Sequence, residues 1–115
     1  MALKITNREV DGVAVVALDG RIVLGEETSA LREKIKNLVG EGKKKIVLNM
    51  NGVTLIDSSG LGALVAAYSS AKSSGASMRL SNLGSHLNQL LQMTKLLTVF
   101  EAYNSEAEAV RSFSN

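Results

Sequence analysis

Hydrophobic and polar positions near the start of the chain predict two strands. Leu3–Val10 alternates weakly, whereas Val13–Leu18 is rich in valine, a β-branched residue that favours extended backbone. Between them, Asp11 and Gly12 form a dipeptide that is typical of a two-residue hairpin turn. We therefore expect the two strands to pair antiparallel.

A helical period replaces this alternation over residues 26–39. Leu31, Ile35, Leu38 and Val39 stand at positions i, i+4, i+7 and i+8, so their side chains share one face of a helix. This stripe predicts an amphipathic helix that packs on the sheet.

Strands and helices continue to alternate along the rest of the chain. Ile46–Leu48 is an unbroken apolar run, typical of a strand covered on both faces, and we expect a loop over 49–54 to follow it. The other predicted elements are a helix over 59–74, a strand around Met78 and Leu80, a helix over 85–94, a short strand over 97–100 and a helix over 105–113.

The predicted order of elements is β-β-α-β-α-β-α-β-α. Strands that alternate with helices form right-handed crossovers and a mostly parallel sheet. The expected fold class is therefore α/β, with a mixed, mostly parallel five-stranded sheet, an antiparallel edge hairpin and about four helices. A length of 115 residues fits a single domain over residues 1–115.

Composition excludes several classes of function. The chain has no cysteine, which rules out disulfides and Cys-bound zinc. The net charge of +2 comes without a basic stripe or interleaved aromatics, so we expect no nucleic-acid partner. No apolar run approaches the roughly 20 residues of a membrane span, and the N-terminus has no signal-peptide pattern. We therefore expect a cytoplasmic protein with no membrane partner.

The stretch Ile56–Gly62, with the sequence IDSSGLG, joins a core strand to a helix. Functional sites in open α/β sheets gather at such junctions. Asp57, Ser58 and Ser59 are all favourable N-cap residues, and the free N–H groups of a helix N-terminus stabilise an added phosphate. Considered alone, the stretch fits both a plain capped helix start and a phosphorylation site.

Two glycines follow the serines in this stretch. Gly60 and Gly62 carry no side chains, so another protein could approach the backbone closely. Gly62 inside a helix costs about 1 kcal/mol relative to alanine, which indicates an offsetting benefit.

The residues give little support to an enzyme. A nucleophile elbow requires glycine two positions before the serine, but Ile56 and Asp57 stand there for Ser58 and Ser59. His86 is the one histidine of the sequence, which is too few for a catalytic triad or a metal-ligand pattern, and the spacing of a P-loop is absent. We expect no catalytic residue, no metal and no cofactor.

Several segments spread over most of the chain resemble the STAS family of bacterial anti-sigma factor antagonists. The segment IDSSGLG is similar to the motif that carries the family's phosphorylated serine. The others are Val13–Arg21 (VAVVALDGR), Lys45–Asn49 (KIVLN), Leu80–Leu83 (LSNL) and Leu90–Phe100 (LLQMTKLLTVF). The resemblance implies a STAS fold and a switch protein that is not an enzyme.

The same resemblance implies how the switch operates. The unphosphorylated protein would bind an anti-sigma factor that is also a serine kinase and so free the sigma factor. The kinase would phosphorylate Ser58, with Ser59 as the second choice, and a metal-dependent serine phosphatase would remove the phosphate. Asp57 would position the loop and mark the target, while Ser59 would cap the helix. The alternative function is a STAS scaffold in a stress-signalling, lipid-transport or anion-transport complex.

The expected partner surface combines the serine motif with the loop before the first long helix. Its residues are Asp57, Ser59, Gly60, Leu61 and Gly62 from the motif and Arg21, Val23 and Glu26 from the loop. Residues 20–25 are unusually apolar for a connection, which fits either a partner contact or a buried segment.

Overall fold

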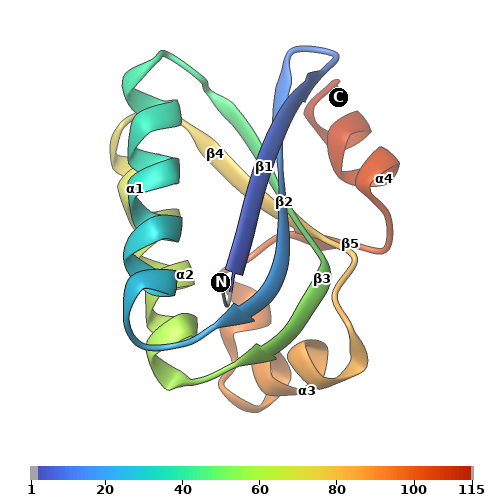
Figure 1. Ribbon diagram of the computed structural model, residues 1–115. Coiled ribbons are helices and arrows are strands. Elements are labelled where there is room, and N and C mark those ends of the chain that lie inside the picture. The colour runs from blue at the N-terminus through green and yellow to red at the C-terminus, as the bar shows by residue number, and fades with distance from the viewer. Residues whose placement is uncertain (1–2, 115) are drawn as a thin grey trace.

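The structure, a computed structural model, describes residues 3–114 and contains one mixed sheet with helices on both faces (Figure 1). The five strands lie side by side in chain order, β1-β2-β3-β4-β5. The elements are β1 (Leu3–Val10), β2 (Val13–Ile22), α1 (Glu26–Gly40), β3 (Lys45–Ile56), α2 (Ser58–Ser73), β4 (Ser77–Ser81), α3 (Ser85–Met93), the 3-10 helix η1 (Leu96–Thr98), β5 (Ala102–Tyr103), α4 (Glu106–Arg111) and the 3-10 helix η2 (Ser112–Ser114).

The predicted hairpin and fold class are confirmed. Asp11 and Gly12 have φ values of 51° and 80°, and positive φ at both central residues is what a type I′ hairpin turn requires. β1 therefore pairs antiparallel with β2, whereas the β2–β3, β3–β4 and β4–β5 pairs are all parallel. The result is the expected α/β sheet with an antiparallel edge.

Helices cover the two faces of the sheet unequally. The parallel helices α1 and α2 pack against each other on one face, the short α4 lies on the other, and α3 lies at the lower end in Figure 1. The main core under α1 and α2 includes Leu31, Ile35, Leu38, Ile46, Leu48 and Leu64. A smaller core under α4 consists of Val13, Val15, Val47, Ala109 and Val110. Between residues 3 and 114, no helix has the length and apolarity needed to cross a membrane.

The expected loop over 49–54 is wrong, because β3 continues without a break to Ile56. This second half of β3 pairs with the second half of β2 as far as Ile22 and Ile56, with register shifts on the way. Its side chains are mostly exposed or half-buried, so it lacks the apolar run that marks a buried strand. The extension carries β3 directly to Asp57.

The expected strand over 97–100 is also wrong. Residues 96–98 form η1, which starts after a left-handed Lys95 with a φ of 62°. Phe100 is buried in the core, but the last strand is the two-residue β5 that follows it. Burial of an apolar side chain does not by itself require a strand, and here a tight turn delivers the same side chain to the core.

Candidate functional site at the start of helix α2

Asp57, not Ser59, caps helix α2. Its backbone is extended, with φ −102° and ψ −177°, and the helix begins at Ser58. The Gly60 backbone N–H donates a hydrogen bond to Asp57 Oδ1 at 2.7 Å. The expectation that Ser59 would be the cap is therefore wrong: β3 pairs with β2 up to Ile56, which holds Asp57 in the extended conformation that an N-cap needs.

The second carboxylate oxygen of Asp57 contacts a different part of the chain. The backbone N–H of Leu24 donates to Asp57 Oδ2 at 3.1 Å, and the Asp57 N–H donates to the Ile22 carbonyl at 3.3 Å. Asp57 thus ties the loop between β2 and α1 to the start of α2. This agrees with the expectation that Asp57 positions the loop, although the loop it holds lies more than thirty residues earlier.

These contacts lower the pKa of Asp57 below its usual value of 3.8, mainly through the hydrogen bond from Gly60 and next through that from Leu24. A carboxyl group whose pKa is lower in the folded state stabilises the fold above the pKa of the unfolded chain. That contribution disappears as the pH falls through the folded-state pKa.

We therefore expect Asp57→Ala to lower the urea midpoint of unfolding at pH 7, because the fold loses an ionised cap. The gap between the two proteins should narrow as the pH falls below 3.8, the usual pKa of an aspartate, and should close once the pH has passed the lower folded-state pKa of Asp57. Urea titrations at several pH values between 7 and 3 measure this gap. A gap that stays constant over that range would contradict the ionised-cap assignment.

The two serines differ in exposure. Ser58 is exposed at the first position of the helix, whereas Ser59 is half-buried. An exposed hydroxyl at the first turn lies beside backbone N–H groups that have no partner within the helix. The geometry therefore offers Ser58, more than Ser59, to an enzyme that modifies serine.

Gly60 has a packing role that the sequence did not reveal. The residue is buried, and a Cβ placed on it would lie 1.9 Å from the Ile22 carbonyl oxygen. Its missing side chain therefore lets α2 approach β2, and the prediction that it admits a partner is wrong. Gly62 is exposed and a Cβ there would meet nothing within 4 Å. Leu61, between them, is half-buried against the core.

The apolar loop before α1 is partly buried and partly exposed, so both sequence-based interpretations, a buried segment and a partner contact, apply to it. Ile22 is buried and Val23 half-buried, whereas Leu24 is 74% exposed. Arg21 and Glu26 are exposed on either side. The parallel pairing of β2 with β3 sets this loop beside Asp57. Leu24 was not singled out from the sequence, where the apolar run of residues 20–25 as a whole was the signal for a partner contact.

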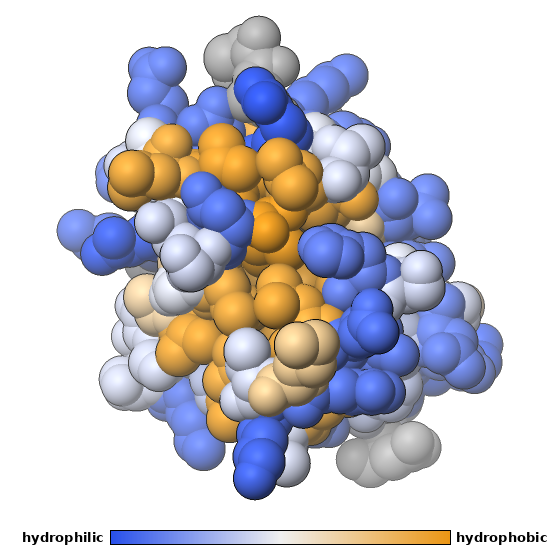
Figure 2. All heavy atoms as spheres, turned by 90° about the horizontal axis from the view of Figure 1, so that it is seen from below, coloured by the Kyte–Doolittle hydropathy of each residue, from blue (hydrophilic) through white to orange (hydrophobic). Residues whose placement is uncertain are grey.

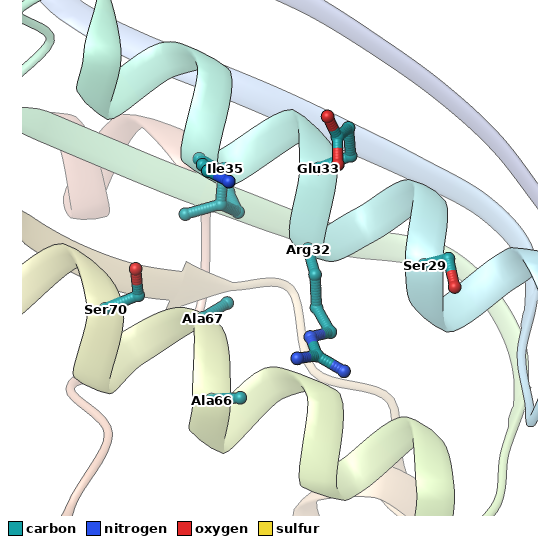
Figure 3. A pocket seen from close by; sticks show the side chains of 8 residues that line it. Ser29, Arg32, Glu33, Ile35, Ala66, Ala67 and Ser70 are labelled. Atoms are coloured by element: carbon teal, nitrogen blue, oxygen red, sulfur yellow. The ribbon is translucent and has the colours of Figure 1, made fainter.

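A groove of about 410 Å³ runs between α1 and α2 (Figure 3). Arg32 reaches from α1 toward Ala66, and the small side chains of Ala66, Ala67 and Ser70 leave the α2 side open. Its remaining lining residues are Ser29, Glu33, Ile35 and Lys36. Ala66 follows Gly62 by four residues, so the two residues lie on the same side of α2.

The histidine and the carboxylates form no further site. His86 is exposed in the first turn of α3, where it lines a small recess with Thr54 and Leu55. Within residues 3–114, no group of three His, Asp or Glu side chains is arranged to hold a metal ion. Among residues 3–114, Asp57 and Ser58 therefore remain the candidate functional residues.

This chain is similar in sequence and in fold to several known proteins. An anti-sigma F factor antagonist from Paenibacillus polymyxa is 28% identical over 112 residues, which cover 96% of this chain and 94% of that protein. Two solved structures share the fold. A candidate anti-sigma factor antagonist from Thermotoga maritima has a TM-score of 0.88 at 23% identity, over 96% of this chain and 95% of that one. The phosphorylated form of the Bacillus cell fate determinant SpoIIAA has a TM-score of 0.74 at 20% identity, over 96% and 99%.

The family resemblance suggested by the serine motif and its flanking strands is confirmed along almost the whole sequence. The sheet order, the long β3 and the capped start of α2 lie inside the matched region. Residues 4–109 match the model of the STAS domain, and the chain belongs to the STAS domain family.

Proposed function

We propose that this protein is a cytoplasmic anti-sigma factor antagonist that is switched off by phosphorylation of Ser58. In its unphosphorylated form it binds an anti-sigma factor serine kinase and frees the sigma factor. The kinase phosphorylates Ser58, the complex dissociates, and a metal-dependent serine phosphatase restores the active form. The protein acts by binding and catalyses no reaction of its own.

The exposed position of Ser58 at the start of α2 is the observation that carries this proposal. The antagonists of similar sequence from Paenibacillus polymyxa and Bordetella bronchiseptica extend over 96% of this chain at 28% and 22% identity. SpoIIAA, which shares the fold, has been solved both with and without its phosphate. The two relatives of similar sequence, both described as anti-sigma factor antagonists, favour an antagonist over a scaffold for a transport complex.

A phosphate at Ser58 changes the surface and leaves the core alone. It adds about −1.5 to −2 charges at pH 7 next to the Asp57 carboxylate, on a side chain that points to solvent. The N-terminus of α2 stabilises the phosphate in the free protein, whereas burial against a partner requires two neighbouring negative groups to lose water. Binding is therefore weakened without any need to refold the domain.

The partner surface proposed around Ser58 retains most of the expected residues. Asp57, Ser59, Leu61, Gly62, Arg21, Val23 and Glu26 lie on the two stretches of chain, residues 21–26 and 57–62, that meet there. Gly60 contributes by letting α2 pack against β2 rather than by direct contact.

We expect purified protein to acquire one phosphate when it is incubated with ATP and the anti-sigma factor kinase of its source organism. Mass spectrometry of the peptide containing Ser58 should locate it there, because this hydroxyl is the exposed one of the pair. Ser58→Ala should remove the modification and Ser59→Ala should retain it. A phosphate that persists in Ser58→Ala, or none in the wild type with any such kinase, would refute the proposed switch.

A further inference from the structure

We propose that Leu24 is the apolar anchor by which this protein holds its anti-sigma factor partner, and that Asp57 is the residue that positions it. This inference rests on the proposed function, since it specifies which contact the partner makes beside Ser58. The occupant of this surface is the anti-sigma factor, which presents an apolar recess bordered by basic side chains.

The large apolar side chains that remain exposed lie at one end of the described structure. They are Leu24, Leu55, Met93 and Val99, which belong to the loop before α1, the end of β3, the end of α3 and the residue after η1. Figure 2 shows this end as a broad apolar area framed by polar residues. Scattered exposed apolar residues are ordinary, but a continuous patch on a monomer marks an interaction surface. Ser58 begins α2 at this same end (Figure 1).

Leu24 has the most direct link to the phosphorylation site. Its backbone N–H donates to Asp57 Oδ2 at 3.1 Å, and Asp57 immediately precedes Ser58. Its side chain is 74% exposed although it directly follows the half-buried Val23. An apolar side chain held outward by a fixed backbone loses little conformational entropy on binding, which is the property of an interface hot spot.

The residues around Leu24 indicate which kind of surface the partner presents. An open groove of about 950 Å³ adjoins it, lined on its apolar side by Leu3, Leu24 and Ala30. Three carboxylates, those of Glu26, Glu27 and Glu33, line the same groove together with one guanidinium, that of Arg32. The excess of negative charge contrasts with the chain's net charge of +2. Such a surface favours a partner that is apolar at its centre and basic at its rim.

The contact also accounts for the direction of the switch. Phosphorylation places a dianion one residue from the carboxylate that holds Leu24. Neither Asp57 nor Ser58 lines the acidic groove that the partner's basic side chains would face. In the complex the phosphate would therefore lie against the apolar recess over Leu24, where it is poorly solvated. Loss of binding then follows from the proximity of Ser58 to the anchor.

The decisive measurement is the affinity of the purified kinase for Leu24 variants, by calorimetry without ATP. We expect Leu24→Ser to weaken binding at least 30-fold, and Leu24→Met, which keeps an apolar side chain of similar volume, to stay within threefold of the wild type. Unfolding curves should be the same for all three proteins, because the side chain is exposed. Equal affinity of Leu24→Ser and the wild type would overturn the proposal.

A double-mutant cycle tests whether Asp57 acts through Leu24. The Gly60 and Leu24 N–H groups donate to different carboxylate oxygens of Asp57. Asparagine has one acceptor oxygen, so in Asp57→Asn it can accept from Gly60 or from Leu24 but not from both. We expect Asp57→Asn to weaken binding about tenfold in the wild type and less than threefold in Leu24→Ser, since the anchor is already lost there. Equal losses in the two backgrounds would show that Asp57 does not position Leu24.

The outcomes separate this inference from the function on which it rests. If the wild type neither binds the kinase nor becomes phosphorylated, the proposed function fails. If the wild type does both and Leu24→Ser binds equally well, only the anchor fails. Sedimentation of the free protein tests whether a second copy of this chain, rather than the kinase, covers Leu24. A wild-type dimer that Leu24→Ser converts to a monomer would overturn the assignment to the kinase.

Discussion

Gly60→Ala should lower the free energy of unfolding by about 3 kcal/mol. The added Cβ would lie 1.9 Å from the Ile22 carbonyl oxygen and 2.9 Å from the Ile56 side chain. Neither the backbone of β2 nor a core side chain can move aside easily, so α2 must shift away from the sheet. Chemical denaturation monitored by circular dichroism measures the change, and the melting temperature should fall by roughly 10 °C.

Gly62→Ala is the matched control, because it makes the same change two residues later in the same helix. A Cβ at Gly62 meets nothing within 4 Å, and alanine favours helix over glycine by about 1 kcal/mol. We therefore expect Gly62→Ala to raise the free energy of unfolding by up to this amount. If both variants were stabilised, or both destabilised equally, the close approach of Gly60 to β2 would be wrong.

Phosphorylation of Ser58 should weaken binding to the anti-sigma factor by roughly 30- to 1,000-fold, as measured by calorimetry or surface plasmon resonance. The modification adds a dianion to the exposed first residue of α2, and a shift of about 2 to 4 kcal/mol corresponds to roughly 30- to 1,000-fold in affinity. Ser58→Asp should weaken binding about 30-fold, because aspartate carries one charge. Ser58→Ala should bind within threefold of the unmodified protein.

The fold itself should tolerate these changes at Ser58. A negative charge in the first turn interacts favourably with the helix N-terminus, so Ser58→Asp should melt at the same temperature as the wild type or higher. Ser69→Asp provides the matched control, since Ser69 is exposed on the same helix but about three turns from its start. Its affinity should equal that of the wild type. A loss as large as that of Ser58→Asp would mean that net charge, rather than position, controls binding.

The contrast between Gly60 and Gly62 shows where prediction from sequence reaches its limit. Both glycines stand in the same motif, and nothing local separates the one that packs from the one that faces solvent. The difference arises from Ile22, which lies 38 positions before Gly60 in the sequence and contacts it only when β2 pairs with β3. Close approach between distant backbones leaves no pattern in either segment.

Which residue caps helix α2 also depends on the pairing of β2 with β3. Asp57, Ser58 and Ser59 have nearly equal capping propensity, so the local signal is ambiguous. Pairing of Ile22 with Ile56 ends the strand at that point and leaves Asp57 as the last extended residue. The extension of β3 over 49–56 was missed for a related reason, because its partner is the equally polar second half of β2.

Local sequence patterns were enough to predict the α/β order, the Asp11-Gly12 hairpin, the apolar stripe of α1 and the family of the IDSSGLG motif. Each of these is carried by short stretches whose spacing, turn chemistry or motif is readable one stretch at a time, without knowledge of how the stretches pack. The identity of the cap, the packing role of Gly60 and the exposed position of Leu24 beside Asp57 became clear only from the three-dimensional structure. These depend on strand pairing between segments more than thirty residues apart, and the energy of such contacts is set by geometry that local sequence does not encode.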